Sequence, residues 1–554
     1  MKISPVAAGN SVEVGDIFEA IQKGDTEQCA RHLNRDRGAV RQTGWGGFTP
    51  LHFAALQGSR PLADLLLSHG ADCNATCDAG QTAFHFASRQ GNVHIMHQML
   101  QHGADLRITD LQGKTALHYA VSGGNVLAAQ YLWEREMFRF SDTDNFKLTP
   151  LHLAASMGNT DMVKYLLRNN RCAVDAADHQ GATALHVAAE RGAIEVSWLL
   201  LQEAGLHVLH LQDNNRLTPV DLSRRGDTFR HQQLTELFTK LINKPPNHKP
   251  KESRGMYYWA LLFPTLGGGA IFLVAVALGV YGGLVCVLLF PWLAKCIFTQ
   301  YHRMSSYQRS PNPVYLGTLA AGMFHSLLCF FGKIRPSISS SDLLLHTSIV
   351  QFSAVLWLFH RLLIKDPGHV RQAEADPRFS RVTDLVETNE SLSRFCIYCE
   401  MFQPDGSKHC KLCGMCILEY DHHCLFLNRC VGRDNRRLFV LFLLAMAVAH
   451  TLFLLAAARY LWRRFTDVPL ATEGTVAGAE IWVLALSVMN FLTGLWETWL
   501  LKEQFQTLSM GTSTYFKHPP HPQRPPRQRW ASVISYLISG RLHRHQWRLS
   551  SVNI

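Results

Sequence analysis

Apolar residues are distributed unevenly along this chain of 554 residues. The first 245 residues are polar and rich in histidine, whereas long apolar runs fill the next 260. The run over 256–298 has 43 residues, enough for two membrane-spanning helices of about 20 residues each, with a turn at 279–283. Each of four more runs is long enough for one span: 314–331, 343–364, 438–462 and 481–501. The pattern therefore predicts six transmembrane helices.

The polar N-terminal part carries an internal repeat. A four-residue pattern that begins with threonine recurs every 33 or 34 residues, and a degenerate sixth copy follows 35 residues later. The copies are Thr49-Pro50-Leu51-His52, Thr82-Ala83-Phe84-His85, Thr115-Ala116-Leu117-His118, Thr149-Pro150-Leu151-His152, Thr183-Ala184-Leu185-His186 and Thr218-Pro219-Val220-Asp221. Threonine can cap the helix that follows it, and proline or alanine at the next position costs no helical hydrogen bond. We therefore predict a helix in each copy, with histidines that serve the fold and bind no metal.

This repeat resembles the ankyrin repeat, over about 180 residues. The resemblance implies a solenoid of stacked helix pairs. Residues 16–33 are expected to form a less regular capping repeat, because the terminal copy of a solenoid needs a polar outer face. We expect the array to bind protein partners on its concave surface, and no catalytic grouping is visible within it.

Seven of the fourteen cysteines and three histidines lie within 396–430, between the fourth and fifth apolar spans. The pairs Cys396/Cys399 and Cys410/Cys413 have the Cys-x-x-Cys spacing that lets both thiolates reach one tetrahedral zinc ion. Two closed sites would use eight of the ten potential ligands, which leaves one cysteine and one histidine free of metal. A free thiol beside a free imidazole is typical of an activated sulfur nucleophile. Spacing alone does not say which pair is free.

Asp421-His422-His423-Cys424, inside this cysteine-rich frame, resembles the signature of the DHHC protein S-acyltransferases, or palmitoyltransferases. The resemblance implies Cys424 as the acylated nucleophile, His422 as its base and Asp421 as the residue that orients the imidazole. It implies two structural zinc ions. The first would be held by Cys396, Cys399, His409 and Cys416, and the second by Cys410, Cys413, His423 and Cys430.

The acyl donor implied by the resemblance is palmitoyl-CoA. The phosphates of CoA would lie near Arg433, Arg436 and Arg437, although these arginines fit an anchoring role on the cytosolic side equally well. Asp366-Pro367-Gly368 resembles the second short motif of the family.

The sequence departs from the family around the nucleophile. Leu425-Phe426 stands where Pro-Trp is usual, and Arg429 replaces an expected asparagine. The family's Thr-Thr-x-Glu element is reduced to Ser513-Thr514-Tyr515-Phe516, without the glutamate. Because the zinc ligands are intact, we expect an active enzyme with slower turnover or altered acyl-chain preference.

These features predict a mainly α fold, with an N-terminal ankyrin-repeat solenoid and a polytopic six-helix transmembrane domain that carries an inserted two-zinc cysteine-rich module. The expected domains are an array with its N-terminal cap (1–230), a basic linker (231–256), transmembrane helices 1–4 (257–364), a cytosolic zinc-binding DHHC module (365–437), transmembrane helices 5–6 (438–502) and a basic cytosolic tail (503–554).

The net charge of +11 favours a membrane protein with basic cytosolic segments over a nucleic-acid-binding protein. Cysteines outside the cluster show no pairing pattern, which suits a reducing cytosol, and the N-terminus shows no apolar signal sequence. The array and a module that uses acyl-CoA should both face the cytosol, so an even number of spans must separate them. With six spans, both termini are then cytosolic. The tail after 519 is basic with aromatic residues and is expected either to lie on anionic lipid or to be disordered.

Repeats, spans and cysteine cluster together resemble the ankyrin-repeat DHHC palmitoyltransferases of the huntingtin-interacting subgroup. The resemblance implies residence in the Golgi or another endomembrane, and ping-pong transfer of a long acyl chain to cysteines of cytosolic and membrane proteins that the repeats recruit. One alternative is a catalytically silent ankyrin and zinc scaffold. The other is a six-span ankyrin ion channel, which the short polar stretch 463–480 disfavours because it has no apolar pore segment.

Overall fold

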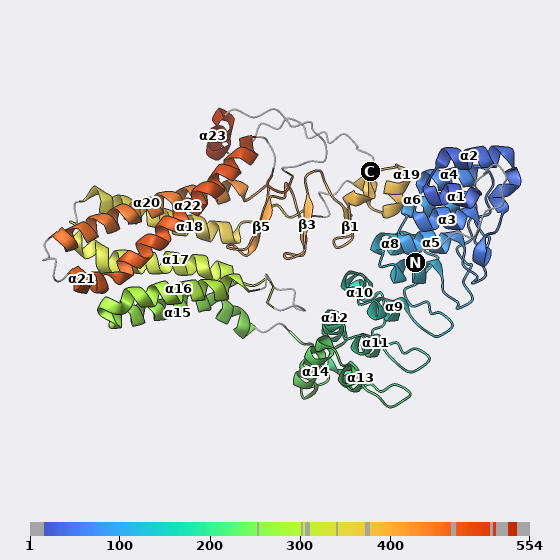
Figure 1. Cartoon of the computed structure of the whole chain (residues 1–554), viewed down its shortest axis with the longest axis horizontal. Coiled ribbons are helices and arrows are strands. Elements are labelled where there is room, and N and C mark those ends of the chain that lie inside the picture. Colours follow the sequence, from blue (N-terminus) through green and yellow to red (C-terminus); the bar gives the residue numbers. More distant parts are fainter. Residues whose placement is uncertain are drawn as a thin grey trace, which may run out of the picture. The chain divides into compact units, whose positions relative to one another are not determined.

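The structure is a computed structural model that describes residues 16–251, 254–300, 303–304, 311–339, 342–371, 377–466, 473–509, 513–516 and 530–539. The chain divides into two compact units (Figure 1). Unit 1 consists of Met1–Lys251 and Pro377–Ile397, and unit 2 consists of Glu252–Asp376 and Tyr398–Ile554.

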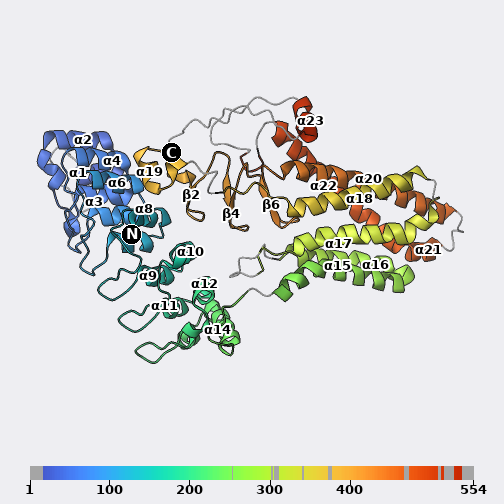
Figure 2. The ribbon, with the colours of Figure 1, turned by 180° about the vertical axis from the view of Figure 1, so that it is seen from behind.

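Unit 1 contains a stack of helix pairs. The first helices of the pairs are α1 (Ile17–Lys23), α3 (Pro50–Gln57), α5 (Ala83–Gln90), α7 (Ala116–Ser122), α9 (Pro150–Ser156), α11 (Ala184–Glu190) and α13 (Pro219–Arg225). The second helices are α2 (Thr26–Arg35), α4 (Arg60–Ser68), α6 (Val93–Gln101), α8 (Val126–Glu134), α10 (Thr160–Leu167), α12 (Ile194–Ala204) and α14 (Phe229–Ile242). Each helix contacts its counterpart in the next pair, and the loops that join successive pairs extend to one side of the stack (Figure 2). Short 3-10 turns are η1 (Arg37–Arg41), η2 (Trp45–Gly47), η3 (Arg168–Asn170) and η4 (Leu206–Leu209). The predicted ankyrin solenoid is therefore present.

Threonine and histidine of each complete repeat form the start of its first helix. In α3, the Thr49 N–H donates to His52 Nδ1 at 3.1 Å, and His52 Nε2 bonds to the carbonyl oxygen of Gln81 at 3.0 Å. Because Nδ1 accepts a hydrogen bond, the proton of the neutral ring lies on Nε2. In the sixth copy the Asp221 carboxylate accepts the bond from Thr218 instead. These contacts confirm that the histidines serve the fold.

Helix α14 overlaps the range predicted as a linker. Its spacing of Leu234, Leu237, Phe238 and Leu241 places four buried apolar residues on one helical face. The degenerate sixth repeat therefore has a second helix like the other copies, and this apolar spacing is the sequence signal that identifies it.

The second segment of unit 1 lies on the array. It contains η9 (Pro377–Phe379), α19 (Val382–Glu387), η10 (Leu392–Arg394) and β1 (Phe395–Cys396). Helix α19 contacts α8 and α6.

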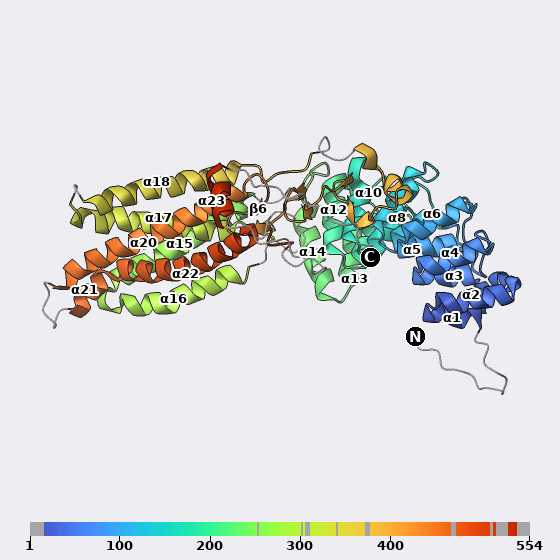
Figure 3. The ribbon, with the colours of Figure 1, turned by 90° about the horizontal axis from the view of Figure 1, so that it is seen from above.

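The long helices of unit 2 lie roughly parallel to one another (Figure 3). They are α15 (Arg254–Ala277), α16 (Gly282–Phe298), α17 (Val314–Cys329), α18 (Leu343–Ile364), α20 (Arg436–Thr466) and α22 (Ile481–Ser509). Helix α17 continues through a π turn, η6 (Phe330–Ile334), and a 3-10 turn, η7 (Arg335–Ser337), while η5 (Gly279–Tyr281) joins α15 to α16. Shorter helices are α21 (Glu473–Ala479) and α23 (Trp530–Ser539).

Among the described residues, five helices are long and apolar enough to cross a membrane, and α16, with 17 residues, is shorter. All six predicted spans are helical. Apolar side chains also cover the outside of the bundle: Leu273, Val287 and Leu343 are each at least 70% exposed. Such a surface is costly in water and suited to lipid.

The cysteine module is built from three two-stranded sheets. The first pairs β1 with β2 (Met401–Phe402). In the second, β3 (Lys408–Cys410) runs antiparallel to β4 (Met415–Ile417), and in the third, β5 (His422–Cys424) runs antiparallel to β6 (Arg429–Val431). Very short strands of this kind bury too little apolar surface to fold alone, so the module needs another source of stability.

Candidate functional site

The module contains two groups of potential metal ligands. One ligand atom of each residue lies within 4.8 Å of the others in the group Cys396, Cys399, His409 and Cys416, and likewise in the group Cys410, Cys413, His423 and Cys430. These are the two sets that the family resemblance implied.

The second group fits a tetrahedral zinc ion. With zinc–ligand bonds of 2.0–2.3 Å, the ligand atoms of such a site are about 3.4–3.8 Å apart. The Cys413 sulfur lies 3.3 Å from His423 Nδ1 and 3.4 Å from the Cys430 sulfur, and the Cys410 sulfur lies 3.6 Å from His423 Nδ1. In the first group, His409 Nδ1 lies 3.3 Å from the Cys399 sulfur and 3.7 Å from the Cys416 sulfur.

Strand pairing brings the ligands together. His409 is directly opposite Cys416 in the β3–β4 sheet, and His423 is directly opposite Cys430 in the β5–β6 sheet. Opposed residues in an antiparallel pair carry their side chains on the same face. Each sheet therefore supplies one histidine and one cysteine to a different ligand group.

Alternation along β5 places His423 on the opposite face of the strand from His422 and Cys424. Successive side chains of a strand point to opposite faces. Because His423 points to the second ligand group, His422 and Cys424 point to the other face. The structure thus resolves what spacing left open: Cys424 and His422 are the cysteine and the histidine that belong to neither group.

Asp421 completes this arrangement. Its side chain is buried, and the Nδ1 atom of His422 lies 2.7 Å from Asp421 Oδ2. Burial by itself would lower the pKa of His422, but hydrogen bonds to Asp421 and Cys424 and the charges of both groups raise it to about 9. Burial alone would raise the pKa of Asp421, yet the hydrogen bond from His422 and the charge of Arg436 hold it well below its ordinary value.

Three further residues hold the Asp421 carboxylate. The Thr514 N–H donates to Oδ1 at 2.7 Å and its hydroxyl to Oδ2 at 3.1 Å, while Gln504 Nε2 on α22 donates to Oδ2 at 3.1 Å. The Arg436 guanidinium lies 3.6 Å from Oδ1. Thr514 belongs to the reduced Thr-Thr-x-Glu element, which therefore reaches the site although its glutamate is missing. Nothing in the sequence pattern of the last span indicated Gln504.

The three arginines predicted to bind CoA phosphates have different surroundings. Arg436 is buried and donates to Thr507 Oγ1 at 2.8 Å. Arg437 donates to the carbonyl oxygens of Leu537 and Ile538, in the last turn of α23, at 2.9 and 2.5 Å. Arg433 is partly exposed and pairs with Asp434 at 3.0 Å. Binding of CoA by these arginines remains a prediction.

The loop after Cys424 contacts four of the long helices. Phe426 lies 6.0 Å from Tyr315 of α17 and 5.3 Å from Trp496 of α22, measured between ring centres. The Asn428 amide donates to the Tyr257 hydroxyl of α15 at 3.5 Å, and Arg429 donates to the carbonyl oxygen of Leu363 in α18. Tyr257, Tyr315 and Leu363 lie in terminal turns of their helices, so the loop after Cys424 lies at the ends of α15, α17 and α18, while Trp496 is midway along α22.

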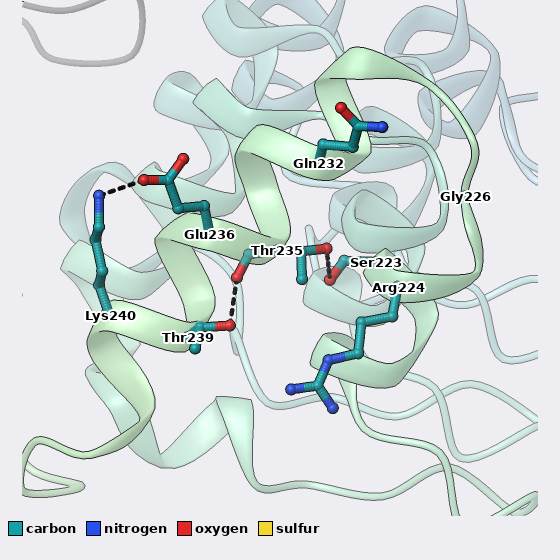
Figure 4. A pocket seen from close by; sticks show the side chains of 8 residues that line it. All are labelled: Ser223, Arg224, Gly226, Gln232, Thr235, Glu236, Thr239 and Lys240. Atoms are coloured by element: carbon teal, nitrogen blue, oxygen red, sulfur yellow. Dashed lines mark hydrogen bonds and ion pairs between the residues drawn. The ribbon is translucent and has the colours of Figure 1, made fainter.

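A separate pocket lies in unit 1, between α13 and α14 (Figure 4). Its polar side chains bond to one another: Lys240 with Glu236 at 2.6 Å, and Ser223 with Thr235 at 2.9 Å. It contains no cysteine or histidine and shares no residue with the cysteine module. We assign no chemistry to it.

Comparison with known proteins matches both parts of the chain. Residues 389–518 match the family model described as DHHC palmitoyltransferase, and residues 51–139 and 136–211 match the model for ankyrin repeats in three copies. Palmitoyltransferase akr1 of Emericella nidulans is 25% identical over 221 residues, 38% of this chain and 29% of the relative. Palmitoyltransferase ZDHHC13 of Mus musculus is 27% identical over 214 residues, 37% of this chain and 34% of the relative.

A probable protein S-acyltransferase 14 of Arabidopsis thaliana is 30% identical over 201 residues, 32% of this chain and 66% of the relative. The chain spans about a third of the length of the fungal and mouse relatives. The apolar helices together with these relatives indicate a multi-pass membrane protein.

Proposed function

We propose that this chain, in which a DHHC palmitoyltransferase domain is combined with ankyrin repeats, is a protein S-palmitoyltransferase. It transfers a long acyl chain from acyl-CoA to cysteines of other proteins through an acyl-enzyme. The observation that carries the proposal is the position of Cys424: outside both ligand groups, on the same strand face as His422, and directly before the loop at the ends of α15, α17 and α18.

The reaction proceeds in two half-reactions. The His422 imidazole, held through Nδ1 by Asp421, presents Nε2 to the Cys424 thiol and takes its proton. The Cys424 sulfur attacks the thioester carbonyl of acyl-CoA, and the CoA thiolate leaves with a proton from His422. In the second half-reaction a substrate cysteine gives its proton to His422 and attacks the acyl group on Cys424, whose thiolate is the leaving group.

Asp421 keeps its negative charge throughout. Its hydrogen bonds from Thr514 and Gln504 fix the carboxylate, which stabilises the imidazolium that forms when His422 is protonated. The imidazolium in turn stabilises the adjacent thiolate. The departures at Leu425, Phe426 and Arg429 leave this part of the site intact, which supports an enzyme over a silent scaffold.

The two ligand groups hold structural zinc. Each group offers four protein ligands, the full set of a structural zinc site, which would leave no coordination position for a substrate. When bound, zinc supplies on the order of 10–16 kcal/mol per site toward folding a segment with too small an apolar core of its own. Cys424 and His422 carry the chemistry and the ligand groups carry the fold.

We further propose that the chain crosses the membrane six times and that both termini lie on the cytosolic side. We also propose that the protein resides in the Golgi or another endomembrane. Helix α16 supports the sixth span because it is apolar, although its 17 residues are fewer than the roughly 20 of a typical transmembrane helix. The assignment to this organelle is based on the family resemblance alone. Recruitment of protein substrates by the array and donation of palmitate by palmitoyl-CoA rest on the same resemblance and on the matched family models.

The chain is too short between α20 and α22 to supply the pore of an ion channel. A pore helix and filter between α20 and α22 would have to fit in residues 467–480, which include the seven-residue α21. A channel would also have no use for the two ligand groups.

Metabolic labelling tests the enzyme. Cells that express the native chain, Cys424→Ser or Cys296→Ser receive an alkyne analogue of palmitate, and hydroxylamine-sensitive label on the purified protein is measured. Cys296 is a matched control because it is a partly exposed thiol on α16, outside both ligand groups. We expect label on the native chain and on Cys296→Ser and none on Cys424→Ser. Equal label on all three would favour the silent scaffold.

A further inference from the structure

The segment between α18 and the cysteine module is folded against the array. Helix α19 contacts α8 and α6, the second helices of the fourth and third pairs, and Val382, Leu385 and Val386 are buried. A helix of six residues is not stable in isolation, because its few hydrogen bonds do not offset the cost of starting a helix. The array therefore determines the fold of this segment.

Glu134, the last residue of α8, makes the polar part of the contact. Its Oε1 accepts the Val382 N–H at 3.0 Å, and its Oε2 accepts both the N–H and the hydroxyl of Thr383 at 2.9 Å. The array holds this carboxylate in place: Gln130 Nε2 donates to Oε1 at 2.8 Å, and the Tyr165 hydroxyl donates to Gln130 at 2.7 Å. One side chain thus receives three hydrogen bonds from the segment.

A second polar contact lies at the other end of α19. The Arg60 guanidinium, on α4, donates to the Asn389 side-chain oxygen at 2.9 Å. Polar contacts at both ends and buried apolar residues between them define a direction and a register. This combination is typical of specific recognition of a peptide, whereas unspecific packing requires neither.

We propose that α6 and α8, around Glu134, form a peptide-binding surface of the array whose resident ligand is residues 380–391 of this same chain. The contact ties the array to the start of the cysteine module. Asn389 and Cys396 are seven Cα–Cα steps apart, which span at most about 25 Å, so the docked segment keeps the first of the expected zinc ligands close to the array. Because the ligand is tethered, its effective concentration at this surface is in the millimolar range.

The proposal does not depend on acyl transfer, and its test needs no substrate. The probe is a fluorescein-labelled peptide with the sequence of residues 380–391, added to the purified full-length chain at up to about 1 mM, the range of a tethered competitor. In the variant Leu385→Asp the chain's own segment carries a charge at a buried position and leaves the surface. Fluorescence anisotropy then reports whether the peptide takes its place.

We expect saturable binding to Leu385→Asp and an apparent affinity at least tenfold lower for the native chain, whose own segment competes for the surface. Adding Glu134→Gln to Leu385→Asp should weaken binding at least tenfold, because an amide replaces the charged acceptor and turns one acceptor atom into a donor. Adding Glu136→Gln should change nothing, since this exposed carboxylate makes no such contact with the segment. Absence of binding to Leu385→Asp, equal binding to the native chain, or equal affinity of the two glutamine variants would each overturn the proposal.

Amide hydrogen exchange on the otherwise native full-length chain gives a second, independent measurement. Exchange in residues 382–389 should be at least tenfold faster in Glu134→Gln than in Glu136→Gln. Equal protection in the two variants would also overturn the proposal.

Discussion

At the scale of single residues, the histidines of the array are neutral helix caps. Nδ1 accepts the N–H of the preceding threonine, so a protonated ring would lose this bond. Burial lowers the pKa of all five, and that of His85 to about 4. These rings stay unprotonated in the folded array at a pH at which the unfolded chain has already bound protons.

The array should lose stability on mild acidification. Histidine titrates near pH 6.5 in the unfolded chain, so the loss begins as the pH falls through about 6.5 and continues until the folded pKa, about 4 for His85. Each buried histidine contributes a slope of up to about 1.4 kcal/mol per pH unit in this window. Urea unfolding of the array, followed by hydrogen exchange at pH 7.5 and pH 5, measures the effect.

The sixth repeat offers a built-in comparison for this prediction. Asp221 performs the same capping with a carboxylate, whose pKa is lowered by hydrogen bonds from Thr218. The variant His186→Asp should therefore show a smaller loss of stability between pH 7.5 and pH 5 than the native chain. A urea midpoint that does not change with pH in the native chain would contradict the argument.

Gln504 acts through Asp421. The variant Gln504→Leu removes one hydrogen bond to the carboxylate and should slow acylation of Cys424 about fivefold, the effect of a bond worth about 1 kcal/mol. Gln506→Leu, the same change two residues along α22, is the control. Acylation rates from alkyne-palmitoyl-CoA in purified protein measure both. An unchanged rate in Gln504→Leu would show that Thr514 and His422 suffice to hold Asp421.

At the scale of elements, the two faces of strand β5 carry side chains with different predicted roles. His423 lies on the face of the second ligand group, and His422 and Cys424 lie on the other. A change at one face is therefore expected to leave the other intact. Zinc content can therefore show whether Cys424 is a zinc ligand or is free to act as the nucleophile.

Zinc content should follow the two ligand groups. Native mass spectrometry or atomic absorption should find two zinc ions per native chain, two in Cys424→Ala, and one or none in Cys413→Ala. A strong chelator should release both ions and make the module accessible to protease, because zinc supplies most of its folding energy. Loss of one ion in Cys424→Ala would instead show that Cys424 is a zinc ligand, which would contradict its proposed role as the nucleophile.

At the scale of the whole molecule, the membrane restricts how the chain is threaded. Residues 377–397 belong to the same unit as the array, so we expect both to lie on one side of the membrane. An even number of spans must then separate Lys251 from Pro377. In the described part of this interval, the long helices are α15, α16, α17 and α18. The parity supports α16 as a span despite its length, since three crossings would put the two segments of unit 1 on opposite sides.

Thiol labelling tests this threading. Asn389→Cys should react with a membrane-impermeant maleimide on sealed vesicles whose cytosolic face is outside, because Asn389 lies on the array. Ser337→Cys, at the end of η7 after the third span, should react only after the membrane is opened with detergent. The measured quantity is the maleimide label on each variant in excess of the label on the native chain, which reports its own thiols. Labelling of Ser337→Cys on sealed vesicles would contradict the six-span arrangement.

Much of the architecture could be predicted from the sequence because its causes are local. The repeat of Thr and His caps indicated the helix pairs, and all six apolar runs became helices, since a helix satisfies its own backbone hydrogen bonds within lipid. The basic composition of 231–256 predicts a linker, whereas the spacing of Leu234 and Leu237 belongs to the apolar face of α14. The tail after 519, apart from 530–539, lies outside the described residues.

For this protein, the sequence by itself determined the helical elements and the ten candidate ligands, and the family resemblance led to Cys424 as the proposed nucleophile. Only the tertiary structure decided what holds Asp421, where the three arginines point, and that α19 rests on the array. The reason is physical. Helix propensity, apolar length and strand alternation act over a few neighbouring residues, whereas Gln504 and Asp421, or Glu134 and Thr383, meet only when distant segments pack together.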